Sequence, residues 1–197
     1  ALPVDAGGQF SVIISGQRPD GYTGEWWELR PAANRLLLRL VAYDWANEVS
    51  PTLALERLDR PMARGRVPAT VLEQRLRAMP VGMGFLAAMF VDHVEQVRAE
   101  GFVHRFKVPD FTNGGGLEGQ FYYEAVYDLA DDDALVIATQ VPETCPYRSL
   151  ILTNELYETT DWYNNHTSLN AAQAAPDGDG RLRIVISAKA PGVKNWL

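Results

Sequence analysis

The amino-acid sequence predicts a mainly β protein of the α+β class, a jelly-roll-like β-sandwich with an antiparallel helical pair inserted at about residues 68–100. Three observations support this prediction. About eight short stretches rich in Val, Ile and Leu are separated by turn residues, which is typical of sandwiches. Helical periodicity is concentrated between residues 68 and 100. A pattern of turn, strand, Pro-Gly loop and tryptophan occurs twice, which indicates one supersecondary unit used twice.

The repeated pattern spans residues 5–27 and 177–197. Each copy begins with Asp and has Gly three residues later. An apolar strand follows and ends in Ile-Ser, and a Pro stands four residues beyond that serine. A Gly and then a tryptophan close the pattern, at Trp26 in the first copy and Trp196 in the second. Because both copies keep the tryptophan, we expect it to fill a core position rather than to hold a ligand.

Three strands are expected in the N-terminal part of the chain. Residues 9–15 are rich in Val, Ile and Phe and follow a Gly-Gly pair. Residues 36–43 are apolar at odd and even positions alike, which predicts a strand buried on both faces. Residues 52–58 alternate between apolar and polar side chains and predict a half-buried strand.

The helical pair is expected at 68–79 and 80–100. In the second helix a stripe at helical spacing should face the protein, and it consists of Leu86, Phe90, His93 and Val97. Gly101 is a suitable residue to end this helix.

Strand signals return at 102–107, 134–141, 147–153, 167–174 and 181–187. The Asp-Gly-Asp-Gly run at 177–180 predicts a hairpin turn, and the Asn-Gly-Gly-Gly run at 113–116 predicts a loop. No low-complexity tract divides the chain, so we expect a single β-sandwich domain over 1–197 with its helical insertion at 68–100.

The composition narrows the classes of partner. Eighteen Lys and Arg residues against 25 Asp and Glu residues give a net charge of −7, so neither nucleic acid nor an anionic membrane surface is expected. The apolar run at 79–91 is far shorter than the ~20 residues that span a membrane. The single cysteine, Cys145, excludes an intramolecular disulfide. No charged-then-apolar leader opens the sequence, so the cytoplasm is the default expectation, with an already removed leader left open.

No metal or cofactor is predicted. The three histidines, His93, His104 and His166, have no close spacing, and no Cys-x-x-Cys pair is present. His93 lies on the apolar stripe of the second helix and is interpreted as a hydrogen-bonded core histidine.

Residues 195–197 read Asn-Trp-Leu and follow an Asp-Gly pair and an apolar strand. In the first copy, Trp27 and Pro31 lead into residues 36–43, which contain an internal Arg and end in Tyr. With residues 147–170, these features resemble a bacterial family known as domain-of-unknown-function family 1214, over roughly half of the chain. The first copy departs from the family pattern, with Glu-Trp-Trp where Asn-Trp-Leu is expected. The resemblance implies a jelly-roll-like sandwich and, because the family has no settled reaction, no activity.

The densest polar and aromatic cluster runs from residue 161 to residue 170. Flat apolar faces and converging hydrogen-bonding groups are what a ligand pocket needs. The predicted ligand-binding residues are Trp162, Tyr163, Asn165 and Asn170. As a catalytic alternative, Asp161 could orient His166 as a general base. In a purely structural interpretation, the asparagines cap a turn and His166 bonds the main chain.

Nothing in the sequence identifies a reaction, so whether the chain is an enzyme stays open. The first hypothesis is a small-molecule-binding domain for a sugar or a flat apolar ligand. The second is a hydrolase or lyase that uses His166 with Asp161, and the third is a structural or assembly module. A cavity beside His166 with Asp161 in hydrogen-bond reach would favour the second hypothesis.

The repeat also predicts a missing strand. The first copy is followed by the apolar run at 36–43, whereas the second reaches Leu197. We therefore expect the sequence to be a segment of a longer polypeptide, or another chain to supply the strand, as in a homo-oligomer.

Overall fold

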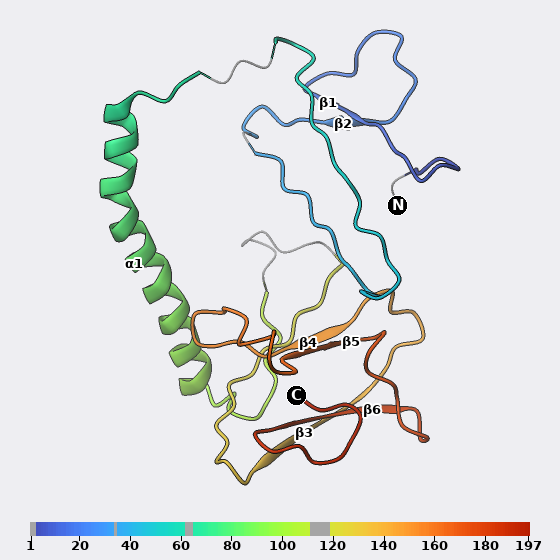
Figure 1. Ribbon diagram of the computed structural model, residues 1–197, viewed down its shortest axis with the longest axis vertical. Coiled ribbons are helices and arrows are strands. Elements are labelled where there is room, and N and C mark those ends of the chain that lie inside the picture. Colours follow the sequence, from blue (N-terminus) through green and yellow to red (C-terminus); the bar gives the residue numbers. More distant parts are fainter. Residues whose placement is uncertain (1–2, 34, 62–64, 111–118) are drawn as a thin grey trace. The chain divides into compact units, whose positions relative to one another are not determined.

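The computed structural model describes residues 3–33, 35–61, 65–110 and 119–197, so the loop predicted at 113–116 lies outside the described residues. The chain divides into two compact units, Ala1–Val41 and Ala42–Leu197, and each is described here by itself. The described residues form six strands and one helix (Figure 1). The class is therefore α+β, with short strands in small sheets and one helix.

In the unit Ala1–Val41, strand β1 (Ile13–Ser15) pairs in parallel with strand β2 (Trp26–Glu28). Of the strand predicted at 9–15, only the last three residues join this ladder. The connection between the strands contains Gly21 with a φ of 71°, a left-handed conformation that glycine adopts without steric cost. The indole Nε1 of Trp26 donates to the hydroxyl oxygen of Ser15 over 2.9 Å and ties β2 to the end of β1.

The unit Ala42–Leu197 contains two antiparallel strand pairs. Strand β3 (Ala134–Gln140) pairs with strand β6 (Arg181–Ser187) over seven residues each. Strand β4 (Ser149–Ile151) pairs with strand β5 (Ser168–Asn170) over three residues each. All four lie within stretches that the sequence predicts as strands. Since β5 and β6 belong to different sheets, the turn at 177–180 leads from one sheet to the other and is not the hairpin that was predicted.

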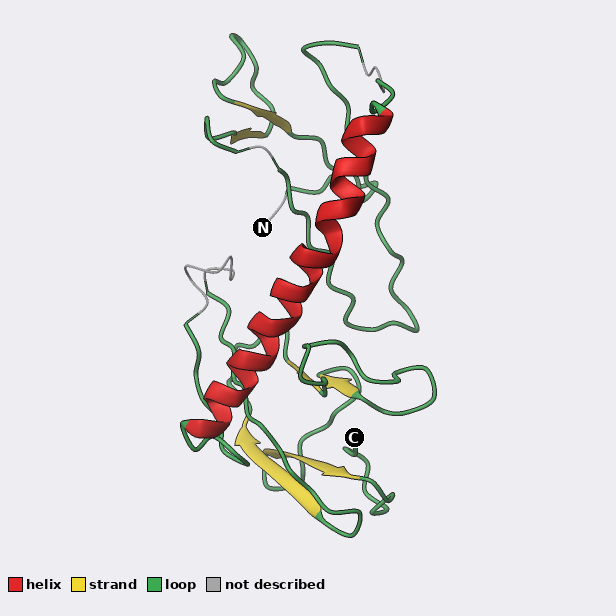
Figure 2. Ribbon diagram, turned by 90° about the vertical axis from the view of Figure 1, so that its left-hand side faces the viewer, coloured by secondary structure: helices red, strands yellow, loops and turns green. Residues whose placement is uncertain are grey.

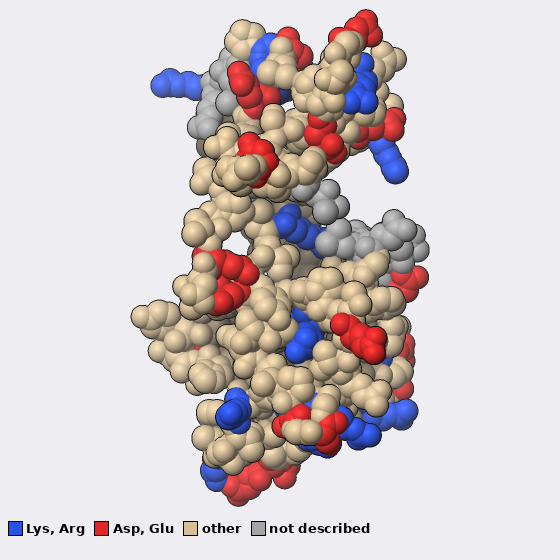
Figure 3. All heavy atoms as spheres, turned by 90° about the vertical axis from the view of Figure 1, so that its right-hand side faces the viewer, with Lys and Arg blue, Asp and Glu red and all other residues tan. Residues whose placement is uncertain are grey.

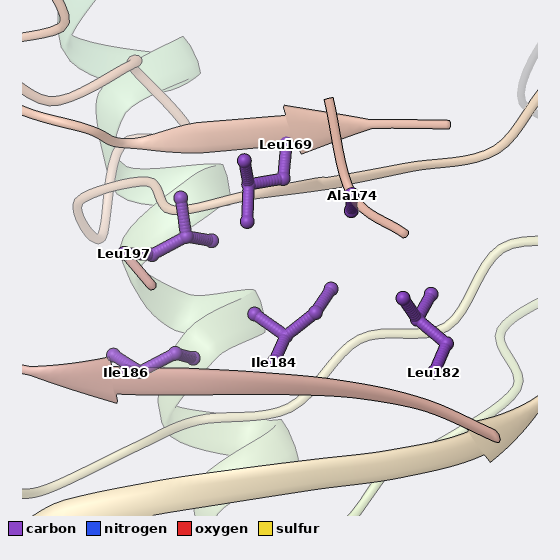
Figure 4. Close-up of a cluster of buried hydrophobic side chains, with 6 residues drawn as sticks. All are labelled: Leu169, Ala174, Leu182, Ile184, Ile186 and Leu197. Atoms are coloured by element: carbon purple, nitrogen blue, oxygen red, sulfur yellow. The ribbon is translucent and has the colours of Figure 1, made fainter. Parts of the chain in front are cut away.

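The core of this unit lies between the two strand pairs (Figure 4). Alternate residues of β6 are buried, because successive side chains of a strand point to opposite faces. They face apolar side chains of β5 and of the segments after β5 and β6. The buried cluster consists of Leu169, Ala174, Leu182, Ile184, Ile186 and Leu197. Burial of each large aliphatic side chain contributes about 1.5–3 kcal/mol, so this layer is the main apolar source of stability.

A single helix, α1 (Ala69–Ala99), of 31 residues stands where the sequence predicts an antiparallel pair at about 68–100 (Figure 2). The prediction of two helices was wrong because it placed a boundary at Pro80, and the helix continues through that residue. Proline has no N–H, so the carbonyl of Leu76 loses its helical donor. This part of α1 is exposed, and water can bond that carbonyl instead.

The stripe predicted to face the protein does so only toward the end of α1. Val97 is buried, with 2% of its surface exposed, whereas Leu86 is 43% exposed. Phe90 and His93 are half-buried. The helix therefore contacts the rest of its unit mainly through its last turns.

Three predicted strands are absent from the described residues. The one predicted at 102–107 is reduced to isolated bridges of Val103 with Val126 and of Lys107 with Glu124. Residues 36–43 and 52–58 have no regular secondary structure there. The interpretation of 36–43 as a strand buried on both faces was wrong, since Leu37 is 74% exposed. An apolar run becomes a strand only where a neighbouring strand accepts its main-chain hydrogen bonds, and no described strand lies against either run.

No helix in the described part of the chain combines the length and apolarity that crossing a bilayer requires. On the face drawn in Figure 3, Lys and Arg side chains are scattered among Asp and Glu side chains over the described residues.

Candidate functional site

A cavity of about 610 Å³ lies within the unit Ala42–Leu197. The last turns of α1 form one wall through Val94 and Val97, and β3 and β4 form another. The loop at 153–157 contributes polar groups. Volumes of about 300–1,000 Å³ with mostly apolar walls and a few polar groups are usual for small-molecule sites.

Glu124 is the polar centre of this cavity. Its side chain is only 13% exposed. The carboxylate oxygen Oε2 accepts a hydrogen bond from the hydroxyl of Tyr157 over 2.6 Å. The ring nitrogen Nε2 of His93 lies 3.0 Å from the same oxygen and 3.2 Å from Oε1. Helix α1, the segment before β3 and the loop after β4 thus meet at one carboxylate.

The chemistry of Glu124 fixes the direction of these bonds. A carboxylate only accepts, so Nε2 of His93 carries the hydrogen and the phenol of Tyr157 donates its own. What remains toward the cavity are lone pairs on Glu124 and on the phenol oxygen. The cluster is therefore built to accept hydrogen bonds from a hydroxyl or amine group of a ligand.

Tyr157 reaches Glu124 from a strained position. Its φ is 58°, a left-handed value that is uncommon for aromatic residues and that clusters at functional sites. The turn is held by Asn154, whose carbonyl accepts from the main-chain N–H of Tyr157 over 3.0 Å. Phe90 of α1 stacks on the Tyr157 ring with the centroids 5.4 Å apart. Burial raises the pKa of the Tyr157 phenol, and the hydrogen bond to Glu124 and its charge raise it further.

Other charged or titratable residues also line the cavity, namely Arg98, His104, Tyr123, Tyr127 and Glu155. Arg98 lies with its Nη2 3.9 Å from an oxygen of Glu155, an ion pair that is partly exposed to solvent. The ring nitrogen Nε2 of His104 lies 2.9 Å from both the main-chain nitrogen and the main-chain oxygen of Asp128. His104 therefore anchors a loop, and Glu124 with Tyr157 supplies the polar groups that a ligand would meet.

Asp161, which was predicted to orient His166 in a catalytic pair, bonds Asn164 in the structure. Both carboxylate oxygens of Asp161 bond Asn164, one the side-chain amide at 2.8 Å and one the main-chain N–H at 3.2 Å. The side-chain amide of Asn164, followed by its main-chain N–H, lowers the pKa of Asp161. Among the described residues no hydrogen bond joins Asp161 to His166, whose ring lies 6.0 Å from that of Trp196.

The predicted ligand-binding residues are divided between the surface and the core. Trp162 and Tyr163 are 63% and 84% exposed and meet edge to face. The side chain of Asn165 bonds the carbonyl of Asp161. Asn170 is buried, and its amide donates to the carbonyl of Tyr43 over 2.7 Å, a structural role. None of the predicted site residues is among those that line the cavity.

Sequence reasoning did not find the Glu124 cluster because its members are far apart along the chain. Glu124 lies 31 positions from His93 and 33 from Tyr157. The one available signal was a histidine on an apolar helical stripe. No group of His, Cys, Asp and Glu within the described residues is arranged to hold a metal ion.

No family model matches the chain, and no curated protein matches it either. A comparison with solved structures finds similarity to a crystal structure of an uncharacterized protein from Burkholderia cenocepacia, with a TM-score of 0.85 and 25% sequence identity. The match covers 100% of this chain and 54% of that chain, so this chain spans about half the length of that relative.

Proposed function

We propose that the unit Ala42–Leu197 binds a small molecule in its cavity, with Glu124 and Tyr157 holding the polar part of the ligand. The observation that carries the proposal is a carboxylate that is 13% exposed and faces a cavity of about 610 Å³. A carboxylate in such a position requires hydrogen-bond donors, and a ligand with a hydroxyl or amine group adds one. Leu135, Leu150 and Leu152 line the same cavity and suit the apolar body of the ligand.

The test is a thermal-shift screen of hydroxyl- and amine-bearing small molecules, followed by titration calorimetry of each hit. Glu124→Gln keeps the shape of the side chain and removes its charge, so we expect it to weaken binding by about 10–100-fold, as loss of a charge-assisted hydrogen bond does. Tyr157→Phe should weaken binding by less.

Trp162→Ala is the matched control, since Trp162 is exposed and does not line the cavity. It should leave the affinity unchanged. Hits that lose affinity in Trp162→Ala and keep it in Glu124→Gln would contradict the cavity and assign binding to the aromatic surface.

The exposed pair of Trp162 and Tyr163 supports a second candidate, a stacking platform for a sugar ring. Tryptophan and tyrosine offer flat apolar faces with a polar edge. The two rings meet at an interplanar angle of 78°, so one sugar ring could stack on only one of them. This leaves the cavity as the better candidate.

We also propose that the chain belongs to domain-of-unknown-function family 1214 and that its architecture is of the jelly-roll type. The pairing of Trp196 with β6 through Val185 supports the family pattern Asn-Trp-Leu as a structural motif. The two strand pairs on either side of one core support a sandwich. A crystal structure of the chain would test both, since a jelly roll requires two sheets with Greek-key connections.

A further inference from the structure

The two copies of the repeated pattern make corresponding hydrogen bonds. The main-chain N–H of Ile13 donates to the carbonyl of Glu25 over 3.0 Å, and that of Val185 donates to the carbonyl of Asn195 over 2.8 Å. Ile13 pairs in parallel with Trp26, and Val185 pairs in parallel with Trp196. Residues 13–15 of the first copy therefore correspond to residues 185–187 of the second.

The serines and tryptophans extend this correspondence. The hydroxyls of Ser15 and Ser187 each donate to the carbonyl two residues later, over 2.6 Å and 2.8 Å. The indole of Trp26 bonds the hydroxyl of Ser15, and the indole of Trp196 bonds the carbonyl of Ser187. Because their main-chain pairing and serine contacts correspond, we expect the two strands to need similar hydrogen-bond partners at their remaining edges.

Strand β6 uses both of its edges. Val185 bonds the segment 195–197 on one side. On the other side the strand pairs with β3, where Ile186 stands opposite Leu135 and Ile184 stands opposite Ile137. The side chains of Ile184 and Ile186 belong to the buried cluster of this unit and are 5% and 6% exposed.

Strand β1 uses one edge. Ile13 and Ser15 bond β2, and adjacent residues of a strand direct their main-chain groups to opposite edges. The N–H and C=O of Ile14, which corresponds to Ile186, therefore point away from β2. Within the described residues of the unit Ala1–Val41, β1 has β2 as its sheet neighbour and no strand on this second edge. Val12 and Ile14 are only half-buried, unlike their counterparts in β6.

We propose that the second edge of β1 binds an antiparallel strand of a partner polypeptide with the chemistry of β3, apolar at alternate positions opposite Ile14 and Val12. The contacts of β6 define this occupant, because an edge of main-chain donors and acceptors is satisfied by another strand. Pairing of two β1 edges in a dimer of this chain is the alternative occupant, and sedimentation distinguishes it in the test below.

The probe is a synthetic peptide with the sequence of residues 131–141, which contains β3 and begins with three aspartates that aid solubility. It is added to the full chain, and amide hydrogen exchange is followed by NMR. We expect the amide of Ile14 to become protected, while those of Ile13 and Ser15 are protected from the start by β2.

Two modified peptides form a matched pair. An N-methyl group at the position of Leu135 removes the N–H that would bond Ile14, and one at Val136 alters an N–H that points away. The first should weaken binding at least about tenfold, and the second much less. Absence of peptide binding, equal effects of both methylations, or an Ile14 amide already protected in a dimer seen by sedimentation would each overturn the proposal.

Discussion

At Tyr157, a left-handed backbone, a partly buried ring and a hydrogen bond to Glu124 coincide. The strain at this residue is compensated by the stacking of Phe90 and by the bond to the carboxylate. Such a residue is positioned by its neighbours rather than by its own preference. At the scale of the residue, the site is therefore one acceptor, the Glu124 carboxylate, with two donors, His93 and Tyr157.

The raised pKa of Tyr157 gives a pH prediction. The folded chain holds the phenol proton more tightly than the unfolded chain, whose tyrosine pKa is about 10. The resulting stabilisation is fully present below that value and is lost as pH rises through the window above it. The free energy of unfolding should therefore fall more steeply above about pH 10 in the unmodified chain than in Tyr157→Phe. Urea denaturation at several pH values measures this, and equal slopes would show that Tyr157 is not perturbed.

At the scale of the element, α1 is a long helix whose side chains become more buried toward its C-terminal end. Its first half exposes several large apolar side chains, among them Leu72, Leu76 and Met79. Its last turns hold the buried Val97 and the half-buried Phe90 and His93. The helix is therefore stabilised by packing at its C-terminal end, and its N-terminal turns depend on local propensity.

This gradient predicts the cost of truncations along α1. Val97→Ala should lower the free energy of unfolding by about 2 kcal/mol, through lost burial and a small cavity. Phe90→Ala should cost about 1–2 kcal/mol, less than the ~3–5 kcal/mol of a fully buried phenylalanine. Leu86→Ala is the control and should stay within about 0.5 kcal/mol. Chemical denaturation of the three variants measures these changes. Equal losses of unfolding free energy would mean that α1 packs along its whole length.

At the scale of the whole molecule, the buried apolar cluster belongs to one unit. All its residues, from Leu169 to Leu197, lie within Ala42–Leu197. The unit Ala1–Val41 has a parallel pair of three-residue strands, and so small a sheet is marginal in water by itself. The two units should therefore differ widely in their own stability.

We expect a chain of residues 42–197 to fold without residues 1–41, with an unfolding midpoint close to that of the full chain. Leu197→Ala in the full chain is the contrasting change, because it removes a core side chain and should cost about 2–5 kcal/mol. Circular dichroism during thermal unfolding compares the three proteins. If the shortened chain is unfolded while Leu197→Ala is stable, the core of Ala42–Leu197 is not sufficient for that unit to fold.

The sequence predicted strand β6 correctly and the run at 36–43 incorrectly, and the difference has a physical reason. Strand β6 coincides with the predicted run at 181–187, since alternating apolar residues bounded by a Gly turn fix its face and its start. The run at 36–43 carries an equally strong apolar signal and has no regular structure among the described residues. A strand requires a neighbour, and the sequence of the strand does not contain that neighbour.

The sequence by itself determined the α+β class, the helical character of residues 69–99, the strands of the core and the repeated turn–strand–tryptophan pattern. These depend on local periodicity and on glycine and proline geometry. Only the tertiary structure decided that α1 runs through Pro80, that Asp161 bonds Asn164, and that His93 and Tyr157 meet at Glu124, which lines a cavity. The last outcome depends on contacts between residues more than thirty positions apart, which local pattern does not encode.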